Sequence, residues 1–234
     1  PIKNMVKTLH HRGPDEQGLL FSKFAHLGHA RLSIIDIENG QQPMLTKKKD
    51  LAITYNGEIY NHPELRKKLI KKGYKFQTKC DTEVLLYLYQ EYQEKILPML
   101  NGQFAFALID FNKKSLFMAR DRVGIRPLFY TKIKNTIYFA SSIKSLLQNP
   151  NIPKDFNYQA YYQLISLWSP LANNTFFKSI NTLEPGKFLK YYKEGIKKNT
   201  YWDIAFPIHH KNRSLEEWKV LVQKSISNSI KLSL

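Results

Sequence analysis

Asn56 and Gly57 end an apolar run in the stretch ITYNGEIYNHPEL (53–65) and are compatible with two structures. An Asn-Gly pair after a strand is typical of a tight hairpin turn. A hairpin needs a return strand, but only four residues follow before His62-Pro63 breaks the pattern. The alternative is that the pair presents a side-chain amide and a backbone N–H to a ligand, with no Cβ to crowd it. The short sequence before His62 favours this alternative over the turn.

Arg31 lies in an otherwise apolar stretch, between Ala30 and Leu32. A buried charge without a partner costs several kcal/mol, so an inward-facing Arg31 must be paired. An arginine on an edge strand that faces water fits the sequence equally well. Both alternatives remain open from the residues alone.

Two carboxylates and one thiol complete the set of candidate reactive groups. The simplest interpretation of Glu58 is a surface acid. For Asp81 we favour the role of a helix N-cap. Cys80 is the only cysteine, which excludes an internal disulfide and fits a reducing compartment. The neighbouring Asp81 is expected to raise the thiol pKa and lower its reactivity. We therefore interpret Cys80 as a small packing residue.

Alternating apolar patterns predict the strands that must position these groups. The predicted strands are 25–35, 51–55, 104–109, 116–119, 128–131, 136–140 and 188–191. The predicted helices are 2–9, 62–72 with Leu65, Leu69 and Ile70 as its apolar face, 82–92, 143–147 and 214–234. Antiparallel hairpins flanked by a few helices indicate an α+β fold and argue against a doubly wound parallel sheet.

The net charge of +17 raises the question of a nucleic-acid partner. Only 7 of the 36 basic residues are arginines, the residue that base and phosphate recognition favours. Lysines spread over the whole length are typical of a solvated surface, so we expect no nucleic-acid partner. No apolar stretch approaches the roughly 18 residues of a membrane span, and no signal-peptide pattern opens the chain, so we expect a cytoplasmic protein. The histidines lack metal-ligand spacing, and we expect no metal site.

Four stretches carry a family resemblance when taken in order: HHRGPDEQG, HARLSIIDIENGQQP, YNGEIYNH and KCDTEVLLYLY. Together they resemble the glutamine amidotransferase domain of glutamine-hydrolysing asparagine synthetases, a class II domain of the N-terminal-nucleophile hydrolase fold. GQFAFALID, RDRVGIRPLFY, LEPGKF and TYWD extend the resemblance over nearly the whole chain. It implies a four-layer αββα sandwich of two antiparallel sheets over residues 1–190. Residues 191–234 would form a linker and the first helix of a synthetase domain.

The resemblance also implies a site for L-glutamine. Arg31 would bind the α-carboxylate, with Leu32 and Ile34 lining the same pocket. Glu58 and Asp81 would lie near the α-amino group. The Asn56 amide and the Gly57 N–H would form an oxyanion hole, in which one donor is typically worth about 3 kcal/mol of the barrier.

The sequence departs from the family at three points. The family's nucleophile is an N-terminal cysteine whose own amine moves the proton, and this sequence has none. Cys80 is internal and cannot replace it. The Ser-Gly-Gly loop that binds ATP in the synthetase half is also absent, and Ser142 stands where the family usually has an acid. We therefore expect the chain as printed to bind glutamine without turnover, and to need no cofactor. An intact parent would use ATP and magnesium to amidate L-aspartate.

Other functions remain compatible with the sequence. One is a non-catalytic glutamine-binding or partner-binding module, and another is an amidotransferase domain for a different acceptor. A basic nucleic-acid binder would show salt-dependent affinity for DNA or RNA. The sequence leaves a homodimer open.

Overall fold

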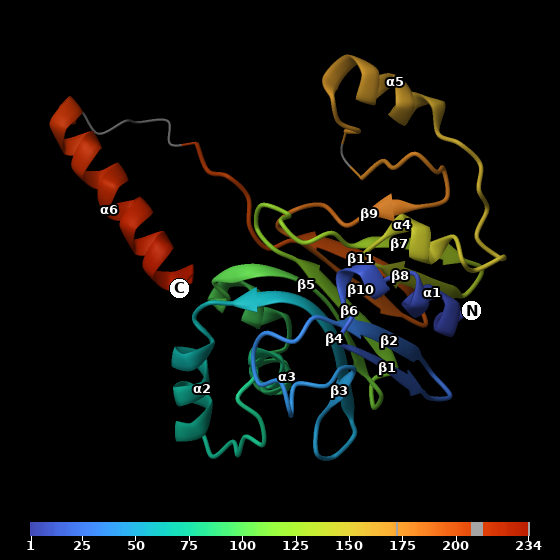
Figure 1. Cartoon of the computed structure of the whole chain (residues 1–234), viewed down its shortest axis with the longest axis horizontal. Coiled ribbons are helices and arrows are strands. Elements are labelled where there is room, and N and C mark those ends of the chain that lie inside the picture. Colours follow the sequence, from blue (N-terminus) through green and yellow to red (C-terminus); the bar gives the residue numbers. More distant parts are fainter. Residues whose placement is uncertain (172, 207–212, 234) are drawn as a thin grey trace.

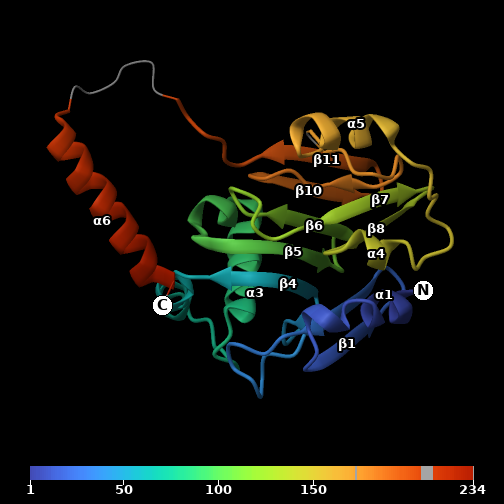
Figure 2. The same cartoon turned by 45° about the horizontal axis from the view of Figure 1, so that its top comes forward.

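The strands of this computed structural model form one large sheet and two small ones (Figure 1). The structure describes residues 1–171, 173–206 and 213–233. All strand pairs are antiparallel. The main sheet has six strands in the order β11 (Gly195–Thr200), β10 (Lys187–Tyr192), β6 (Ser115–Arg120), β5 (Gly102–Asp110), β4 (Leu51–Ile59) and β3 (Met44–Leu45). Figure 2 shows β4, β5, β6, β10 and β11 stacked in that order.

The two small sheets form a second layer against the main sheet. One pairs β1 (Glu16–Phe21) with β2 (His26–Arg31), and the other has the order β8 (Thr136–Ala140), β7 (Phe129–Ile133) and β9 (Asn181–Thr182). Leu27 of β2 and Tyr130 of β7 share one apolar cluster with Ala105 and Ala107 of β5. The small side chains of β5 on this face let the two layers approach each other.

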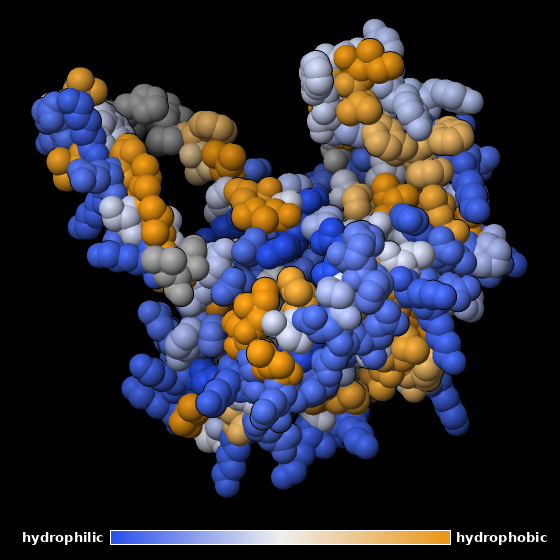
Figure 3. Space-filling model, viewed as in Figure 1, coloured by the Kyte–Doolittle hydropathy of each residue, from blue (hydrophilic) through white to orange (hydrophobic). Residues whose placement is uncertain are grey.

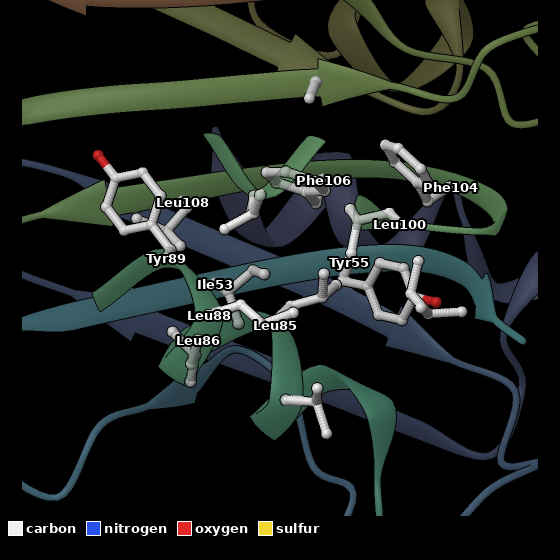
Figure 4. Packing of buried hydrophobic residues seen from close by; sticks show 14 of the residues in the cluster. Ile53, Tyr55, Leu85, Leu86, Leu88, Tyr89, Leu100, Phe104, Phe106 and Leu108 are labelled. Atoms are coloured by element: carbon white, nitrogen blue, oxygen red, sulfur yellow. The ribbon is translucent and has the colours of Figure 1, made fainter. Parts of the chain in front are cut away.

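Helices cover the outer faces of both sheet layers. The helices α2 (His62–Lys71) and α3 (Asp81–Tyr92) pack on the main sheet, and Leu65 of α2 belongs to the largest core. Figure 4 shows Leu85 of α3 in this core together with Phe104 and Phe106 of β5. The helices α1 (Ile2–Lys7) and α4 (Ile143–Leu146) lie on the second layer, where Met5 packs on a small cluster that contains Ala140 and Leu146. The predicted αββα sandwich is confirmed.

Several element boundaries differ from the sequence prediction. The strand predicted over 25–35 ends at Arg31, because the carbonyls that follow accept hydrogen bonds from the Arg31 side chain. The strand predicted over 51–55 continues to Ile59, so no turn forms at Asn56-Gly57. On α2, Leu65 and Leu69 are buried as predicted, but Ile70 is 53% exposed and lies outside the apolar face.

The remaining helical elements were only partly predicted. The helix α5 (Tyr158–Leu167) was not predicted, because prolines and aromatic residues around it indicated coil. Two short 3₁₀ helices span His10–Arg12 and Gln93–Met99. None of the helices in the described part of the chain is long and apolar enough to cross a membrane.

The chain beyond residue 190 still contributes to the main sheet, since β10 and β11 extend it to Thr200. The linker predicted to follow lies partly at 207–212, outside the described residues. The helix α6 (Leu215–Ser233) then stands away from the sandwich (Figure 1). A capping box forms at its start: Ser214 N–H donates to Glu217 Oε2 over 2.7 Å, and Glu217 N–H donates to Ser214 Oγ over 3.2 Å. Its apolar stripe is exposed and includes Trp218, Val222, Ile226 and Ile230 (Figure 3).

Candidate functional site

The strand β4 directs one row of backbone N–H groups away from β5. In an antiparallel strand, alternate residues direct their N–H and C=O groups to the same side. Tyr55 N–H donates to Gln42 Oε1 over 2.7 Å, and Ile59 N–H donates to Asp81 Oδ2 over 3.0 Å. Gly57 lies between them and directs its N–H to the same side. The opposite residue on β5, Phe104, uses its carbonyl to accept from Asp121 N–H instead. Among the described residues, the Gly57 N–H is therefore left without an acceptor.

The Asn56 side chain faces the space between the two sheet layers. Successive side chains of a strand alternate between its faces, so Asn56 and Glu58 share the face of Thr54. The Thr54 Oγ1 lies 3.0 Å from Nδ1 of His29 on β2, which fixes the direction of this face. The Asn56 amide and the Gly57 N–H thus stand side by side at the border of the inter-sheet space.

Glycine at position 57 also has a packing role. Its φ is +152°, and a Cβ there would lie 2.0 Å from the backbone oxygen of Gln103 on β5. The sequence indicated only that a missing Cβ leaves room for a ligand. The structure shows that it also lets β4 approach β5.

Asp81 is the first residue of α3 and is buried, at 4% exposure. The N-cap position belongs to Cys80, so the predicted capping role of Asp81 is wrong. Its Oδ2 accepts from the Tyr55 hydroxyl over 2.6 Å as well as from Ile59 N–H. Burial, and then the Asp81 charge, raise the pKa of Tyr55 well above its usual range, so Tyr55 remains a neutral donor. The start of α3 is thereby joined to β4.

Arg31 is buried at 5% exposure and paired, so the alternative of an edge-strand arginine in water is wrong. Its Nη1 donates to Glu16 Oε2 over 2.8 Å and to the Ile37 carbonyl over 2.9 Å. Its Nη2 donates to the carbonyls of Ile35 and Asp36, over 3.2 and 2.8 Å. A bound carboxylate would have to replace some of these acceptors.

The segment after Arg31 is tied to the start of α3. The Asp36 Oδ2 accepts from Lys79 N–H over 2.6 Å, and this bond is the main reason that the pKa of Asp36 is lowered. Asp15, which had no role assigned from the sequence, accepts from Ser33 N–H over 2.7 Å. Gly40 leaves room for the arginine, since a Cβ there would lie 2.2 Å from Arg31 Nη2.

One cavity of about 1560 Å³ runs between the sheet layers. Every residue that the sequence analysis assigned to glutamine binding lines it: Arg31, Leu32, Ile34, Asn56, Gly57, Glu58 and Asp81. Leu32 and Ile34 are exposed, so they form part of the rim. Glu58 is half-buried rather than a surface acid.

Sequence reasoning missed other residues of this region. His29 and Arg126 line the same cavity, and Glu16, Tyr55 and Asp36 position its walls. Burial, with Arg31 nearby, lowers the pKa of His29 to about 4. The sequence did contain a signal for His29. It lies two residues before Arg31 on the same strand, and alternate residues of a strand share a face.

Cys80 lies at the cavity wall and is 2% exposed. Burial is the largest cause of its raised pKa, and Asp36 and Asp81 raise it further. The predicted direction of this shift is confirmed. In the described part of the chain, no group of three or more His, Cys, Asp or Glu side chains could hold a metal ion.

A sequence model of the family described as "Glutamine amidotransferase domain" matches residues 1–202. The chain belongs to this family. The match covers the whole sandwich, including β10 and β11, and therefore all the residues that line the cavity. The family assignment agrees with the resemblance that the motifs indicated.

Several relatives of this amidotransferase domain are known. It is 40% identical over 211 residues to "Asparagine synthetase [glutamine-hydrolyzing] 3" of Bacillus subtilis (strain 168), covering 89% of the chain and 34% of that protein. It is 44% identical over 146 residues to "Asparagine synthetase [glutamine-hydrolyzing] 2" of Arabidopsis thaliana, covering 62% of the chain and 25% of that protein. "Amidase chyE" of Penicillium rubens matches at 33% identity, over 100% of the chain and 34% of that protein. The chain thus spans about a third of the length of the relatives from B. subtilis and P. rubens.

Solved structures show the same fold. The B. subtilis glutamine phosphoribosylpyrophosphate (PRPP) amidotransferase superposes with a TM-score of 0.61 at 21% identity, over 85% of the chain and 46% of that chain. At this identity the likeness shows the fold alone.

Proposed function

We propose that the chain is the glutamine-binding part of a glutamine-dependent asparagine synthetase. The parent protein would hydrolyse glutamine and use the ammonia to make asparagine. The observation that carries this proposal is the free Gly57 N–H beside the Asn56 amide, in a cavity that Arg31 and Asp81 also line. The names of the relatives supply the reaction.

The chain's own residues have distinct roles in this proposal. Asp81 and Glu58 attract the α-ammonium group of glutamine, and Arg31 receives its α-carboxylate. The Asn56 amide and the Gly57 N–H donate to the side-chain carbonyl oxygen, and their bonds strengthen as that oxygen gains negative charge. Tyr55 holds the Asp81 carboxylate in place.

The finer proposal concerns the rest of the parent protein. Aspartate would be the acceptor, and ATP with magnesium would activate it, in the part of the relatives that this chain does not span. Among the described residues, no group of three or more His, Cys, Asp or Glu side chains could hold a metal ion. We also propose a cytoplasmic location and no nucleic-acid partner.

A second candidate is glutamine binding without hydrolysis by the chain as printed. The observation in its favour is that Cys80, its only cysteine, is buried and has a raised pKa. A thiol in that state is a poor nucleophile.

Isothermal titration calorimetry with L-glutamine tests the binding proposal. We expect saturable binding that Asp81→Asn and Arg31→Ala each weaken at least about tenfold, the loss of one charge-assisted hydrogen bond. Glu64→Gln removes an exposed acid outside the cavity and serves as the control. No binding of glutamine to the folded chain at millimolar concentration would contradict the proposal. A glutamate-release assay on the chain tests the second candidate, which predicts no release above a reagent blank.

A further inference from the structure

Arg126 is a cation of the cavity wall to which no role has yet been assigned. It follows β6 in the segment 121–128 and lines the same cavity as Asn56 and Gly57. Its Nε is buried and has no hydrogen-bond partner. Within the described ranges, its guanidinium makes no hydrogen bond or ion pair to any residue. A buried donor without an acceptor costs about 1–3 kcal/mol, so it calls for a physical reason.

Backbone contacts place Arg126 at the level of Gly57. The Arg126 N–H donates to Asp121 Oδ2 over 3.0 Å, and Asp121 N–H donates to the Phe104 carbonyl over 2.7 Å. Phe104 is the residue opposite Gly57 in the β4–β5 pair. The Arg126 charge also acts on the Tyr55 hydroxyl. Figure 4 shows Phe104 and Tyr55 toward the same end of these strands.

Asp121 does not neutralise this cation. Its carboxylate accepts from the backbone N–H groups of Val123, Ile125, Arg126 and Phe104. Asp121 is buried at 1% exposure, so these bonds fix the loop that carries Arg126. The loop is therefore rigid at its base, while the guanidinium remains available.

The two arginines of the cavity differ in their surroundings. Arg31 already has one carboxylate and three carbonyls around its terminal nitrogens. Arg126 has none of these, and its loop lies at the same level along the strands as Asn56 and Gly57. Asn56, Gly57 and Arg126 thus bring three kinds of donor to one end of the cavity, and no carboxylate pairs with them in the described structure.

We propose that Arg126 binds the side-chain carboxylate of glutamate, so that the cavity discriminates between glutamate and glutamine. This inference rests on the proposed function, in which glutamine lies with its side-chain amide at the Asn56–Gly57 end. The amide of glutamine offers the guanidinium one neutral acceptor, whereas a carboxylate offers an opposite charge and two oxygens for a bidentate pair, which is the stronger interaction. Arg126 thus determines how strongly the product of hydrolysis is retained.

Calorimetry with L-glutamine and L-glutamate on the folded chain tests this inference. Arg126→Gln should weaken glutamate binding about tenfold and glutamine binding less than about threefold, because glutamate loses an ion pair and glutamine loses only a hydrogen bond to a neutral acceptor. Arg126→Lys keeps the charge and should restore part of the loss for glutamate. Arg122→Gln is the matched control, because Arg122 belongs to the same loop but does not line the cavity. It should leave both affinities unchanged.

The outcomes separate this inference from the proposed function. If both amino acids bind the unchanged chain and Arg126→Gln leaves the ratio of their dissociation constants unaltered, the role of Arg126 is refuted and the glutamine site stands. If Arg126→Gln abolishes glutamine binding as well, Arg126 holds the α-carboxylate and the proposed discrimination is also wrong. If neither amino acid binds the unchanged chain, the proposed function itself fails.

Discussion

The two faces of the main sheet have opposite compositions. On the helix side, Tyr55, Ile59 and Phe117 are large and almost fully buried against α2 and α3. On the cavity side, the same strands present Thr54, Asn56 and small alanines. One strand, β4, thus serves stability with its odd-numbered side chains and binding with its even-numbered ones. The comparison teaches that substitutions on the two faces should affect different measurements.

The largest expected loss of stability is on the helix side. Phe117 is 1% exposed and contacts the rings of Tyr89, Phe106 and Phe188. Phe117→Ala should lower the free energy of unfolding by about 3–5 kcal/mol, because the packed rings cannot fill the space. Urea denaturation measures this loss. A loss below about 1 kcal/mol would mean that this face is not the main source of stability.

Gly57 belongs to both faces and should show a mixed effect. Gly57→Ala would place a Cβ against the Gln103 oxygen at a positive φ. We expect a loss of about 1–3 kcal/mol in unfolding free energy together with weaker glutamine binding, because the N–H is displaced. Denaturation and calorimetry on the same sample measure both. An unchanged stability would contradict the packing role of this glycine.

The third prediction concerns pH and the cavity side. The pKa of His29 is about 4 in the folded chain, below its ordinary value of 6.5, so the unfolded chain binds this proton first as the pH falls. Stability should therefore be intact above pH 6.5 and fall between pH 6.5 and about 4, by no more than about 3 kcal/mol, because one pKa unit corresponds to about 1.4 kcal/mol. Denaturation from pH 7 to 4 measures the fall. In His29→Gln the fall should be smaller, and an equal fall would exclude His29 as its cause.

The smallest effect on stability should come from the cavity side. Asn56→Ala removes a half-buried amide that faces the cavity and should change the free energy of unfolding by no more than about 0.5 kcal/mol. Glutamine binding should nevertheless weaken, because the remaining Gly57 donor acts alone. Comparing the urea midpoint with the dissociation constant checks both statements. A large loss of stability would contradict the statement that cavity-side residues serve binding and not stability.

The motifs of the sequence were sufficient to predict the layered fold and seven of the residues that line the cavity, but not His29 or Arg126. Local pattern identified the hairpin of β5 and β6, because both strands alternate around a polar turn. Local pattern gave the wrong role for Asp81. Aspartate is a residue type that often caps helices, but the Asp81 carboxylate accepts hydrogen bonds from Tyr55 and Ile59 of β4. Local pattern also misplaced the end of β2. The carbonyls of Ile35, Asp36 and Ile37 accept hydrogen bonds from the Arg31 side chain and do not pair in the sheet.

The role of Arg126 could not be predicted either. Its motif, RDRVGIRPLFY, contains three arginines with the same local signal. Arg120 donates to backbone carbonyls, Arg122 points elsewhere, and only Arg126 reaches the cavity. Which arginine reaches the cavity depends on the hydrogen bonds that Asp121 accepts from the loop backbone, and residue spacing alone does not predict these bonds.

The bond between Asp36 and Lys79 has a kinetic consequence. It joins the segment 32–37 to Lys79, two residues before α3 begins, so the two segments cannot move apart without breaking this bond. Access past Leu32 and Ile34 then depends on rotation of exposed side chains, which takes picoseconds to nanoseconds, and not on slower backbone opening. Small amino acids should consequently enter and leave this hollow at rates set by diffusion and desolvation, without a conformational step to wait for.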